Sequence, residues 1–263
     1  MNTKGEFLLA ELHKVTPAYL LEEFVTMPDG SVITEPDCVK YLGIHFDNHM
    51  NFSKHIDIVS SKISRVIGPL WKSDHLNMKA KRAIYSGLVE SHLSYGILVW
   101  AATLSRNLTT NLGIDHTPSS LKAIATAQNK IVRAIVRKPK YNKNEGTYTC
   151  TSKLYKDLGF LKLNDLYYFN LALLAHKVVH HKSDLPTSIR DKFKLKADVT
   201  VLSSRTRTCN LDLYYELPNN LGTYRKPTLA AAIYWNKLPI DLKSTESYNS
   251  FKKKLMNFLI ERY

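Results

Sequence analysis

The sequence predicts a mainly α-helical fold, in which a short N-terminal β segment is followed by a helical bundle and a second helical C-terminal region. Between residues 53 and 138, apolar residues recur every three or four positions, which is the spacing of helices with one buried face. β-branched and aromatic residues gather instead near residues 32–46, which favours short strands there. The 263 residues, 44% of them hydrophobic, can form one large domain or two small ones.

Changes in composition divide the chain into four expected parts. In the acidic first part, "PAYLLEEF" predicts a helix and "MPDG" a turn, and further on "SVIT" and "CVKYLGIHF" each predict a short strand. The polar stretch "KPKYNKNEG" is the best linker candidate. The expected parts are an unrelated acidic extension at 1–31, a β segment at 32–52, a helical bundle at 53–138 and a helical C-terminal region at 147–263.

The first two helices of the bundle are expected between residues 53 and 100. The first begins at Ser53, a favourable N-cap residue, and Gly68 and Pro69 should kink or end it. The second runs from Asn77 to about Trp100. It ends in "YGILVWAA", which is so apolar that it must be buried.

A third helix is expected after a mostly polar loop at residues 105–120. Pro118 suits the first helical position and Thr117 suits the N-cap. The apolar stripe of this helix includes Ile124, Ala127 and Ile131, and basic residues form a separate stripe on the same cylinder. The basic residues of the first and third helices are Lys54, Lys62, Arg65, Lys72, Lys122, Lys130, Arg133 and Arg137.

The C-terminal region is also expected to be helical. A short helix should end in a turn at Gly159, and Asn164 should then cap a long helix that reaches about His181. Further helices are expected in "LPTSIRDKF", at 228–235 and at 247–262, with irregular or extended chain at 198–217.

The net charge of +14 is unevenly distributed. Residues 1–60 contain four lysines and nine acidic residues, a net charge of −5, whereas residues 61–263 contain 33 basic and 14 acidic residues, a net charge of +19. A positive field spread over several helices attracts phosphates and is screened by salt. The charge pattern therefore favours a polyanionic partner over a merely solvated surface.

Two groups of histidines have spacings that metal sites also use. His45, Asp47 and His49 would point the same way on one strand, but Asn48 favours a turn, so we expect polar residues at an exposed strand end. On a helix, His176 and His180 have the four-residue spacing of a metal clasp. Lys177 stands where a metalloprotease has glutamate, which favours a solvated basic helix end. We therefore expect no metal site.

Other catalytic and targeting signals are missing from the sequence. It contains no glycine-rich phosphate loop and no nucleophile turn of the GxSxG type, and its adjacent acidic pair, Glu22–Glu23, lies in a helical-looking stretch. We expect no membrane span and no signal peptide. Cys38, Cys150 and Cys209 are far apart, which favours reduced thiols and an intracellular location, in the nucleus or cytoplasm.

An ordered series of motifs resembles the reverse transcriptases of non-LTR retrotransposons, the LINE-like, jockey-like and CR1-like elements. "VKYLGIHFDNHMNFSKHI", "KISRVIGPLWK" and "AIYSGLVESHLSYGILVWA" are similar to the stretch that follows the family's catalytic strands. The family's later motifs follow in order, as "LKAIATAQNKIVRAIV", "LYKDLGFLKLNDLYYFNLALLAHKVVH", "SRTRT", "AAIYWNKLP" and "SFKKKLMNFLI". Each motif is weak alone, and their shared order from about Val39 to Tyr263 carries the resemblance.

The resemblance implies a role in holding nucleic acid. Val39–Phe52 would be the last edge of the polymerase palm, and residues 53 to about 138 would be a thumb-like helical bundle along the template–primer duplex. RNA or an RNA–DNA duplex would be the partner, with the eight basic residues named above contacting phosphates. The family's metal-binding aspartates, including an aromatic-Ala-Asp-Asp turn, are absent. We therefore expect no catalytic residue and no cofactor, because Mg²⁺ serves only the parent polymerase.

Three other functions are compatible with the same sequence. A domesticated structural or interaction protein would dock a partner, such as a separate palm and fingers or another protein, through exposed apolar surface around "YGILVWAA". The chain could also be an inert remnant that folds poorly, or an active polymerase that receives its carboxylates from another chain. The sequence favours a non-catalytic fragment that retains sequence-tolerant binding of RNA or DNA backbone.

Overall fold

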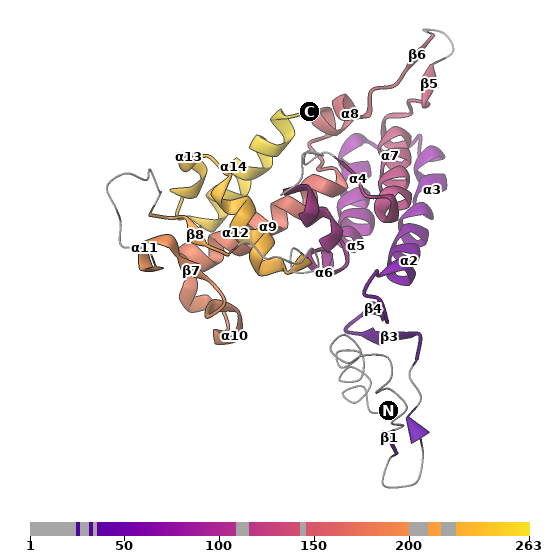
Figure 1. The fold of residues 1–263 in the computed structure, drawn as a ribbon. Helices are drawn as coiled ribbons and strands as arrows, with labels where there is room; N and C mark the ends of the chain where they lie inside the picture. Colours follow the sequence, from indigo (N-terminus) through magenta and orange to yellow (C-terminus); the bar gives the residue numbers. More distant parts are fainter. Residues whose placement is uncertain are drawn as a thin grey trace. The chain divides into compact units, whose positions relative to one another are not determined.

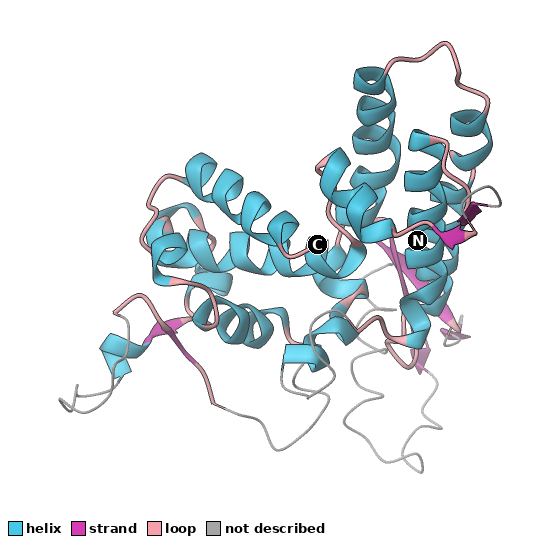
Figure 2. Ribbon diagram, turned by 90° about the horizontal axis from the view of Figure 1, so that it is seen from above, coloured by secondary structure: helices cyan, strands magenta, loops and turns pink. Residues whose placement is uncertain are grey.

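The computed structural model describes residues 25–26, 32–33, 36–108, 116–142, 146–199, 210–216 and 225–263. The chain divides into two compact units, residues 1–59 and 60–263. Helices dominate the described residues and the strands are short (Figures 1 and 2), so the predicted mainly α-helical fold is confirmed. The four expected parts stay predictions. "PAYLLEEF", "MPDG", "SRTRT" and Cys209 lie outside the described residues.

The first unit contains two short antiparallel hairpins. β1 (Val25–Thr26) pairs with β2 (Val32–Ile33), and β3 (Cys38–Tyr41) pairs with β4 (Ile44–Asp47). The prediction of one strand over "CVKYLGIHF" is therefore wrong. Leu42 and Gly43 both have positive φ, 45° and 82°, and so form the kind of two-residue turn that matches the twist of a hairpin.

Helix α2 (Ser53–Ser64) begins at the predicted residue. Its start is fixed by Asp47, whose Oδ1 accepts a hydrogen bond from the backbone N–H of Asn51 at 2.6 Å and whose Oδ2 accepts one from that of Ser53 at 3.1 Å. A carboxylate at a helix N-terminus also interacts favourably with the helix dipole. The β4 strand and α2 are thus joined by a compact, hydrogen-bonded connection.

The break after α2 lies earlier than predicted. The helix ends at Ser64, and Gly68 and Pro69 lie inside a separate short helix, α3 (Ile67–Trp71). Proline is tolerated in the first turn of a helix because the N–H groups there have no intrahelical acceptor. The Gly–Pro pair therefore lies in the beginning of a helix instead of ending one.

The predicted second helix is divided into several pieces. α4 (Met78–Ile84) starts at Asn77, whose side chain accepts a hydrogen bond from Ala80 N–H at 2.8 Å. Gly96 has a φ of 59° and interrupts the helical path, so the prediction of one helix to Trp100 is wrong. The burial predicted for "YGILVWAA" is confirmed for Ile97 and Trp100, which are each 1% exposed. The pieces after α4 are the π-helix η2 (Tyr85–Glu90), α5 (Ser91–Ser94) and α6 (Ile97–Trp100).

The third helix, α7 (Lys122–Val136), is preceded by irregular helical turns. A 3₁₀ helix, η3 (Ala102–Leu108), occupies the start of the region predicted as a loop, and a 3₁₀ turn, η4 (Ser119–Leu121), leads into α7. Pro118 is therefore not at N1 of α7. The Thr117 hydroxyl donates to Asn164 Oδ1 at 3.3 Å, so Thr117 is not its cap.

Helix α9 (Leu163–His180) is the centre of the second unit. It packs against α5, α6, α7, α12 and α14, and buried residues lie along most of its length. Gly159 ends α8 with a φ of 69°, as predicted, but the N-cap of α9 is Lys162, so the prediction of Asn164 as the cap is wrong. Asn164 Nδ2 donates to the carbonyl oxygen of His116 at 3.2 Å instead.

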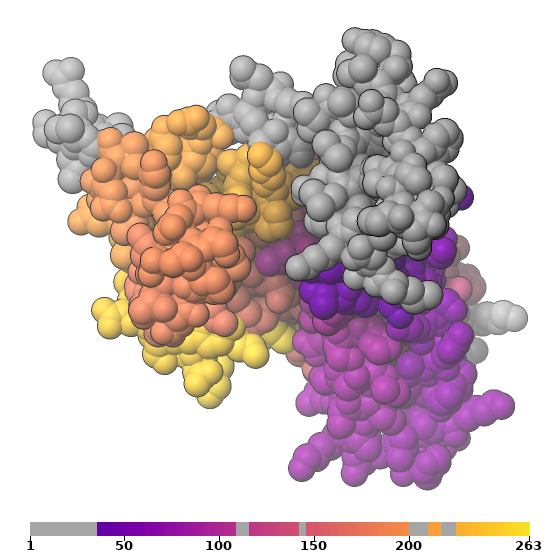
Figure 3. Space-filling view, turned by 90° about the horizontal axis from the view of Figure 1, so that it is seen from below, coloured from indigo at the N-terminus to yellow at the C-terminus, as the bar shows by residue number. Residues whose placement is uncertain are grey.

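The remaining elements surround α9 and α7. In the space-filling view, the orange-to-yellow segments form one continuous surface on the face shown (Figure 3). No helix among the described residues is both long and apolar enough to traverse a lipid bilayer. These elements are β5 (Tyr141–Asn142), β6 (Thr147–Tyr148), α8 (Thr151–Leu158), η5 (Lys182–Asp184), α10 (Thr187–Arg190), β7 (Lys194–Leu195), α11 (Lys196–Val199), β8 (Leu213–Tyr214), α12 (Pro227–Asn236), α13 (Ile240–Lys243) and α14 (Tyr248–Glu261).

Candidate nucleic-acid interface

A polar groove of about 360 Å³ lies between α2 and α7 within the second unit. Lysine ammonium groups and hydroxyl groups are among the donors that proteins use to hold phosphate oxygens. No acidic side chain contributes to the lining, so nothing in it repels an anion. The lining residues are Ser60 and Ser64 from α2 and Lys122, Ala123, Thr126, Ala127 and Lys130 from α7.

The helical repeat of α7 aligns the donors of this groove. Residues four positions apart lie on one face of a helix, so Lys122, Thr126 and Lys130 form a line. Ile124 and Ile131 point away from it and are completely buried. The predicted apolar stripe of α7 is thereby confirmed, and the two lysines of the groove are exposed.

Two of the predicted basic residues on α7 are placed differently from these lysines. Arg137 forms an ion pair with Asp74, and its Nη2 also donates to the carbonyl oxygen of Trp71 at 2.8 Å. Arg133 is half-buried and interacts electrostatically with the buried hydroxyl of Tyr155. Arg137 therefore ties the end of α7 to the α3–α4 connection, which leaves Lys122 and Lys130 as the more accessible charges.

The other four predicted residues are exposed but do not line the groove. Lys62 and Arg65 lie at the rim of a separate pocket of about 540 Å³, whose interior is mostly apolar. Lys72 follows the last residue of α3. Lys54 lies in the first turn of α2, which belongs to the first unit.

Serine and threonine in the groove were not identified from the sequence. Ser60 and Ser64 are four residues apart on α2, as Thr126 is from each of the two lysines on α7. Such four-residue polar repeats are a readable signal of one helix face. What the sequence does not give is that these two faces lie next to each other.

The histidines near β4 are held by local packing. His45 and His55 stack with ring centroids 6.1 Å apart, and both carboxylate oxygens of Asp47 accept the backbone hydrogen bonds described above. His49 is exposed. Among the residues that the structure describes, no three histidine, cysteine or acidic side chains are grouped so that they could hold a metal ion.

The histidines of α9 join it to the segment between α13 and α14. His176 Nε2–H donates to Thr245 O at 2.7 Å, His180 Nε2–H to Lys243 O at 2.7 Å and His181 Nε2–H to Glu246 O at 3.1 Å. The expectation of a solvated helix end is wrong for His176, which is fully buried and stacks on Phe251 at 4.2 Å. Burial lowers the pKa of His176 to about 4.

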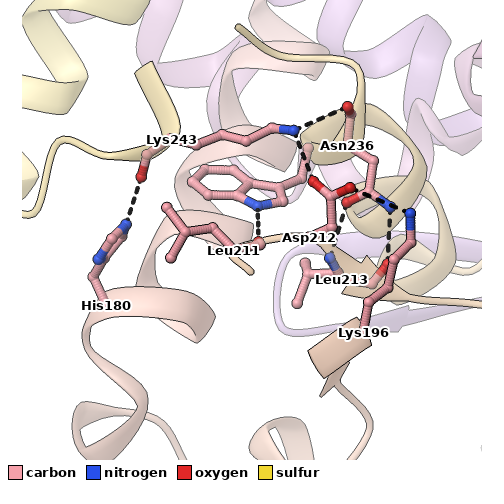
Figure 4. A network of polar contacts seen from close by, with 8 residues as sticks. His180, Lys196, Leu211, Asp212, Leu213, Asn236 and Lys243 are labelled. Carbon is pink, nitrogen blue, oxygen red and sulfur yellow. Dashed lines mark hydrogen bonds and ion pairs between the residues drawn. The ribbon is translucent and has the colours of Figure 1, made fainter. Parts of the chain in front are cut away.

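Asp212 organises a second polar cluster, which includes the "YWNKLP" motif (Figure 4). Its two carboxylate oxygens accept hydrogen bonds from Lys243 Nζ at 2.9 Å and from Lys196 Nζ at 3.3 Å. Asn236 hydrogen-bonds both the N–H and the C=O of Leu213, at 2.9 and 2.8 Å, and so fixes β8 against α12. These polar residues of the motif thus have a structural role.

Gln128 has a similar role in the motif on α7. Its Nε2 donates to Tyr85 Oη at 2.8 Å and to the carbonyl oxygen of Leu161 at 2.9 Å, and its Oε1 accepts from Leu163 N–H at 2.9 Å. Gln128 is 1% exposed. It therefore joins α7, η2 and the start of α9 in the interior of the second unit.

The chain is similar to three RNA-directed DNA polymerases of Drosophila melanogaster mobile elements. It is 26% identical to the probable polymerase from transposon BS over 136 residues, which are 48% of this chain and 14% of that protein. It is 26% identical to the probable polymerase from transposon X-element over 138 residues, which are 51% of this chain and 13% of that protein. The polymerase from mobile element jockey is 26% identical over 183 residues, 68% of this chain and 17% of that protein.

The chain thus matches less than a fifth of the length of each of these relatives, between 13% and 17%. No protein-family model matches the sequence. No solved structure matches it either. The resemblance predicted from the order of the motifs is nevertheless confirmed, and the chain is related in sequence to the RNA-directed DNA polymerases of non-LTR retrotransposons.

Proposed function

We propose that this chain binds the backbone of RNA or of an RNA–DNA duplex, and that it acts as a non-catalytic, C-terminal part of a retrotransposon polymerase. The groove between α2 and α7 supports the proposal, because its lining combines two exposed lysines with three hydroxyl side chains. The similarity to RNA-directed DNA polymerases supports nucleic acid as the ligand class. The non-catalytic role is based on the sequence, which lacks the aromatic-Ala-Asp-Asp turn.

The spacing of the lysines suits contact with successive phosphates of one strand. Eight residues separate Lys122 from Lys130, which is about 12 Å along the helix axis at a rise of about 1.5 Å per residue. A strand of duplex DNA advances roughly 3.4 Å per nucleotide, so the two ammonium groups would span about three or four nucleotides. Contacts of this kind carry no base information, and binding should be tolerant of sequence.

The test is a binding titration of an RNA–DNA hybrid with the double variant Lys122→Glu/Lys130→Glu. Each lost phosphate contact removes about 0.9 from the slope of log affinity against log salt, so the affinity at about 0.1 M salt should fall roughly 10- to 100-fold. Lys252→Glu/Lys253→Glu is the matched control, because both lysines are exposed on α14 and the change in net charge is the same.

Equal loss of affinity in both variants would contradict the groove as the binding site and would indicate a diffuse charge effect. Binding that is unaffected in both would contradict the proposed ligand. The proposed contacts use lysine and hydroxyl groups only, so removal of divalent cations with EDTA should leave the affinity unchanged. A requirement for Mg²⁺ in binding would indicate a different kind of site.

A second candidate function is docking of a protein partner. The pocket of about 540 Å³ contains Leu70, Leu76 and Leu88, and Leu88 is 52% exposed, so an apolar side chain could enter. Its basic rim favours an amphipathic helix with acidic flanks. The region of "YGILVWAA" is a weaker candidate, because Ile97 and Trp100 are buried. A fluorescent amphipathic Leu/Glu peptide should bind and should lose affinity with Leu88→Lys, and no binding would remove this candidate.

A further inference from the structure

The hairpin β5–β6 follows the C-terminal end of α7 and carries two tyrosines on its surface. It extends beyond the ends of α7 and α8 (Figure 1). Tyr141 pairs with Tyr148 across the two strands. The base of the hairpin is fixed by Thr149, whose N–H donates to Lys140 O at 3.0 Å and whose hydroxyl donates to Pro139 O at 2.6 Å. The tyrosines are therefore presented on a hydrogen-bonded support.

The two rings are unusually open to solvent for aromatic side chains. Tyr148 is 73% exposed and Tyr141 is 44% exposed. Their centroids are 5.1 Å apart and their planes meet at 60°, so the rings contact each other edge to face. In this arrangement they do not stack face to face on each other, and an added planar group can lie on an open ring face.

Basic residues lie directly beside these rings. Lys138 and Lys140 are exposed and precede Tyr141 in the chain. Lys138 is also held in place, because its N–H donates to Arg133 O at 3.0 Å and so continues the end of α7. Aromatic faces next to ammonium groups are the combination with which proteins bind single-stranded nucleic acid, because bases stack on the rings and phosphates contact the cations.

We propose that the β5–β6 hairpin binds unpaired nucleotides of RNA or DNA by stacking bases on Tyr141 and Tyr148. This inference rests on the proposed function, since it assigns a single-stranded segment of the same nucleic acid to the hairpin. The groove contacts Lys122 and Lys130 lie on α7, and the hairpin follows the end of that helix. A strand that leaves the groove at this end would reach the two tyrosines.

The test compares three probes that share one RNA–DNA hybrid. The first is blunt, the second carries a single-stranded tail of about eight nucleotides, and the third carries an abasic tail of the same length. The wild-type chain should bind the base-containing tail more tightly than the abasic tail. Tyr141→Ala/Tyr148→Ala should remove this preference, a change of roughly 5- to 150-fold for one or more stacked bases. Tyr141→Phe/Tyr148→Phe keeps both rings and should retain it.

The possible results separate the two proposals. Equal affinity for the base-containing and abasic tails would overturn the stacking role while leaving the groove intact. A loss in the alanine variant that is equally large for the blunt hybrid would also overturn it, because the hairpin would then act on the duplex or on folding. Failure of the wild-type chain to bind any of the probes would overturn the proposed function itself.

Discussion

Replacement of Gln128 by methionine tests whether the polar residue in the α7 motif is needed for folding. Methionine is close to glutamine in length and volume, so the substitution removes hydrogen bonds and creates little cavity. The three partners, Tyr85 Oη, Leu161 O and Leu163 N–H, lose their bonds to Gln128. Gln128 and Tyr85 are 1% and 2% exposed, so water cannot easily replace these bonds.

The expected loss is a substantial part of the stability of a domain. A buried polar group that loses its partner costs about 1–3 kcal/mol, and relaxation makes the sum for three groups smaller than their total. Gln128→Met should therefore lower the free energy of unfolding by about 3 kcal/mol, against the roughly 5–15 kcal/mol that a typical protein has. Tyr85→Phe removes one of these bonds and should cost about 1 kcal/mol.

Urea unfolding followed by circular dichroism measures both variants and their combination. In the Gln128→Met background, Tyr85 has already lost its bond to Gln128, so the second change should cost less than it does in the wild type. The two substitutions should therefore be coupled by about 1 kcal/mol. A cost below about 1 kcal/mol for Gln128→Met, or strictly additive effects, would refute the role assigned to Gln128.

Three further predictions concern the C-terminal region. His176 has a pKa of about 4 in the folded chain and 6.5 as its ordinary value, so the unfolded chain binds a proton first as the pH falls, and stability is lost between about pH 6.5 and 4. At pH 5 the loss should be about 1–2 kcal/mol, and it should be absent in His176→Leu when unfolding is measured across this range; an unchanged pH dependence would contradict the assignment. Asp212→Asn leaves the ammonium of Lys243, whose side chain is 5% exposed, without its carboxylate, and should cost about 3–5 kcal/mol in a thermal or urea melt, whereas Lys196→Met, at a more open position, should cost less than about 1 kcal/mol; equal costs would argue against a buried pair. Tyr263→Phe removes the hydroxyl that donates to Asp165 Oδ2 at 2.7 Å and accepts from Lys162 N–H at 2.9 Å, and should cost about 1–3 kcal/mol in the same assay; a neutral effect would show that water replaces both bonds.

Helices with a clear apolar period could be predicted from the sequence. Ile124, Ile131 and Ile135 determine the inner face of α7, and the N-cap preference of Ser53 locates the start of α2. The turn at Gly159 was also predictable, because glycine readily adopts the left-handed conformation that ends α8. In these places local propensity and tertiary packing favour the same structure.

Other features depend on contacts that a single sequence does not display. The turn at Leu42–Gly43 has a leucine with positive φ, which local preference disfavours, so a continuous strand was expected there. His176 has a polar side chain, yet it is buried because the segment before α14 supplies a carbonyl acceptor 69 residues further along the chain. The groove likewise requires α2 and α7 to be neighbours, and only the fold provides that.

The salt dependence of binding tests the central claim most directly. The affinity for an RNA–DNA hybrid should be measured between about 50 and 200 mM salt, for the wild-type chain and for Lys122→Glu/Lys130→Glu. If these lysines of the α2–α7 groove contact phosphates, the slope of log affinity against log salt should be smaller in the variant by about 2. An identical slope in the two proteins, or a wild-type affinity that does not change with salt, would contradict backbone binding through this groove.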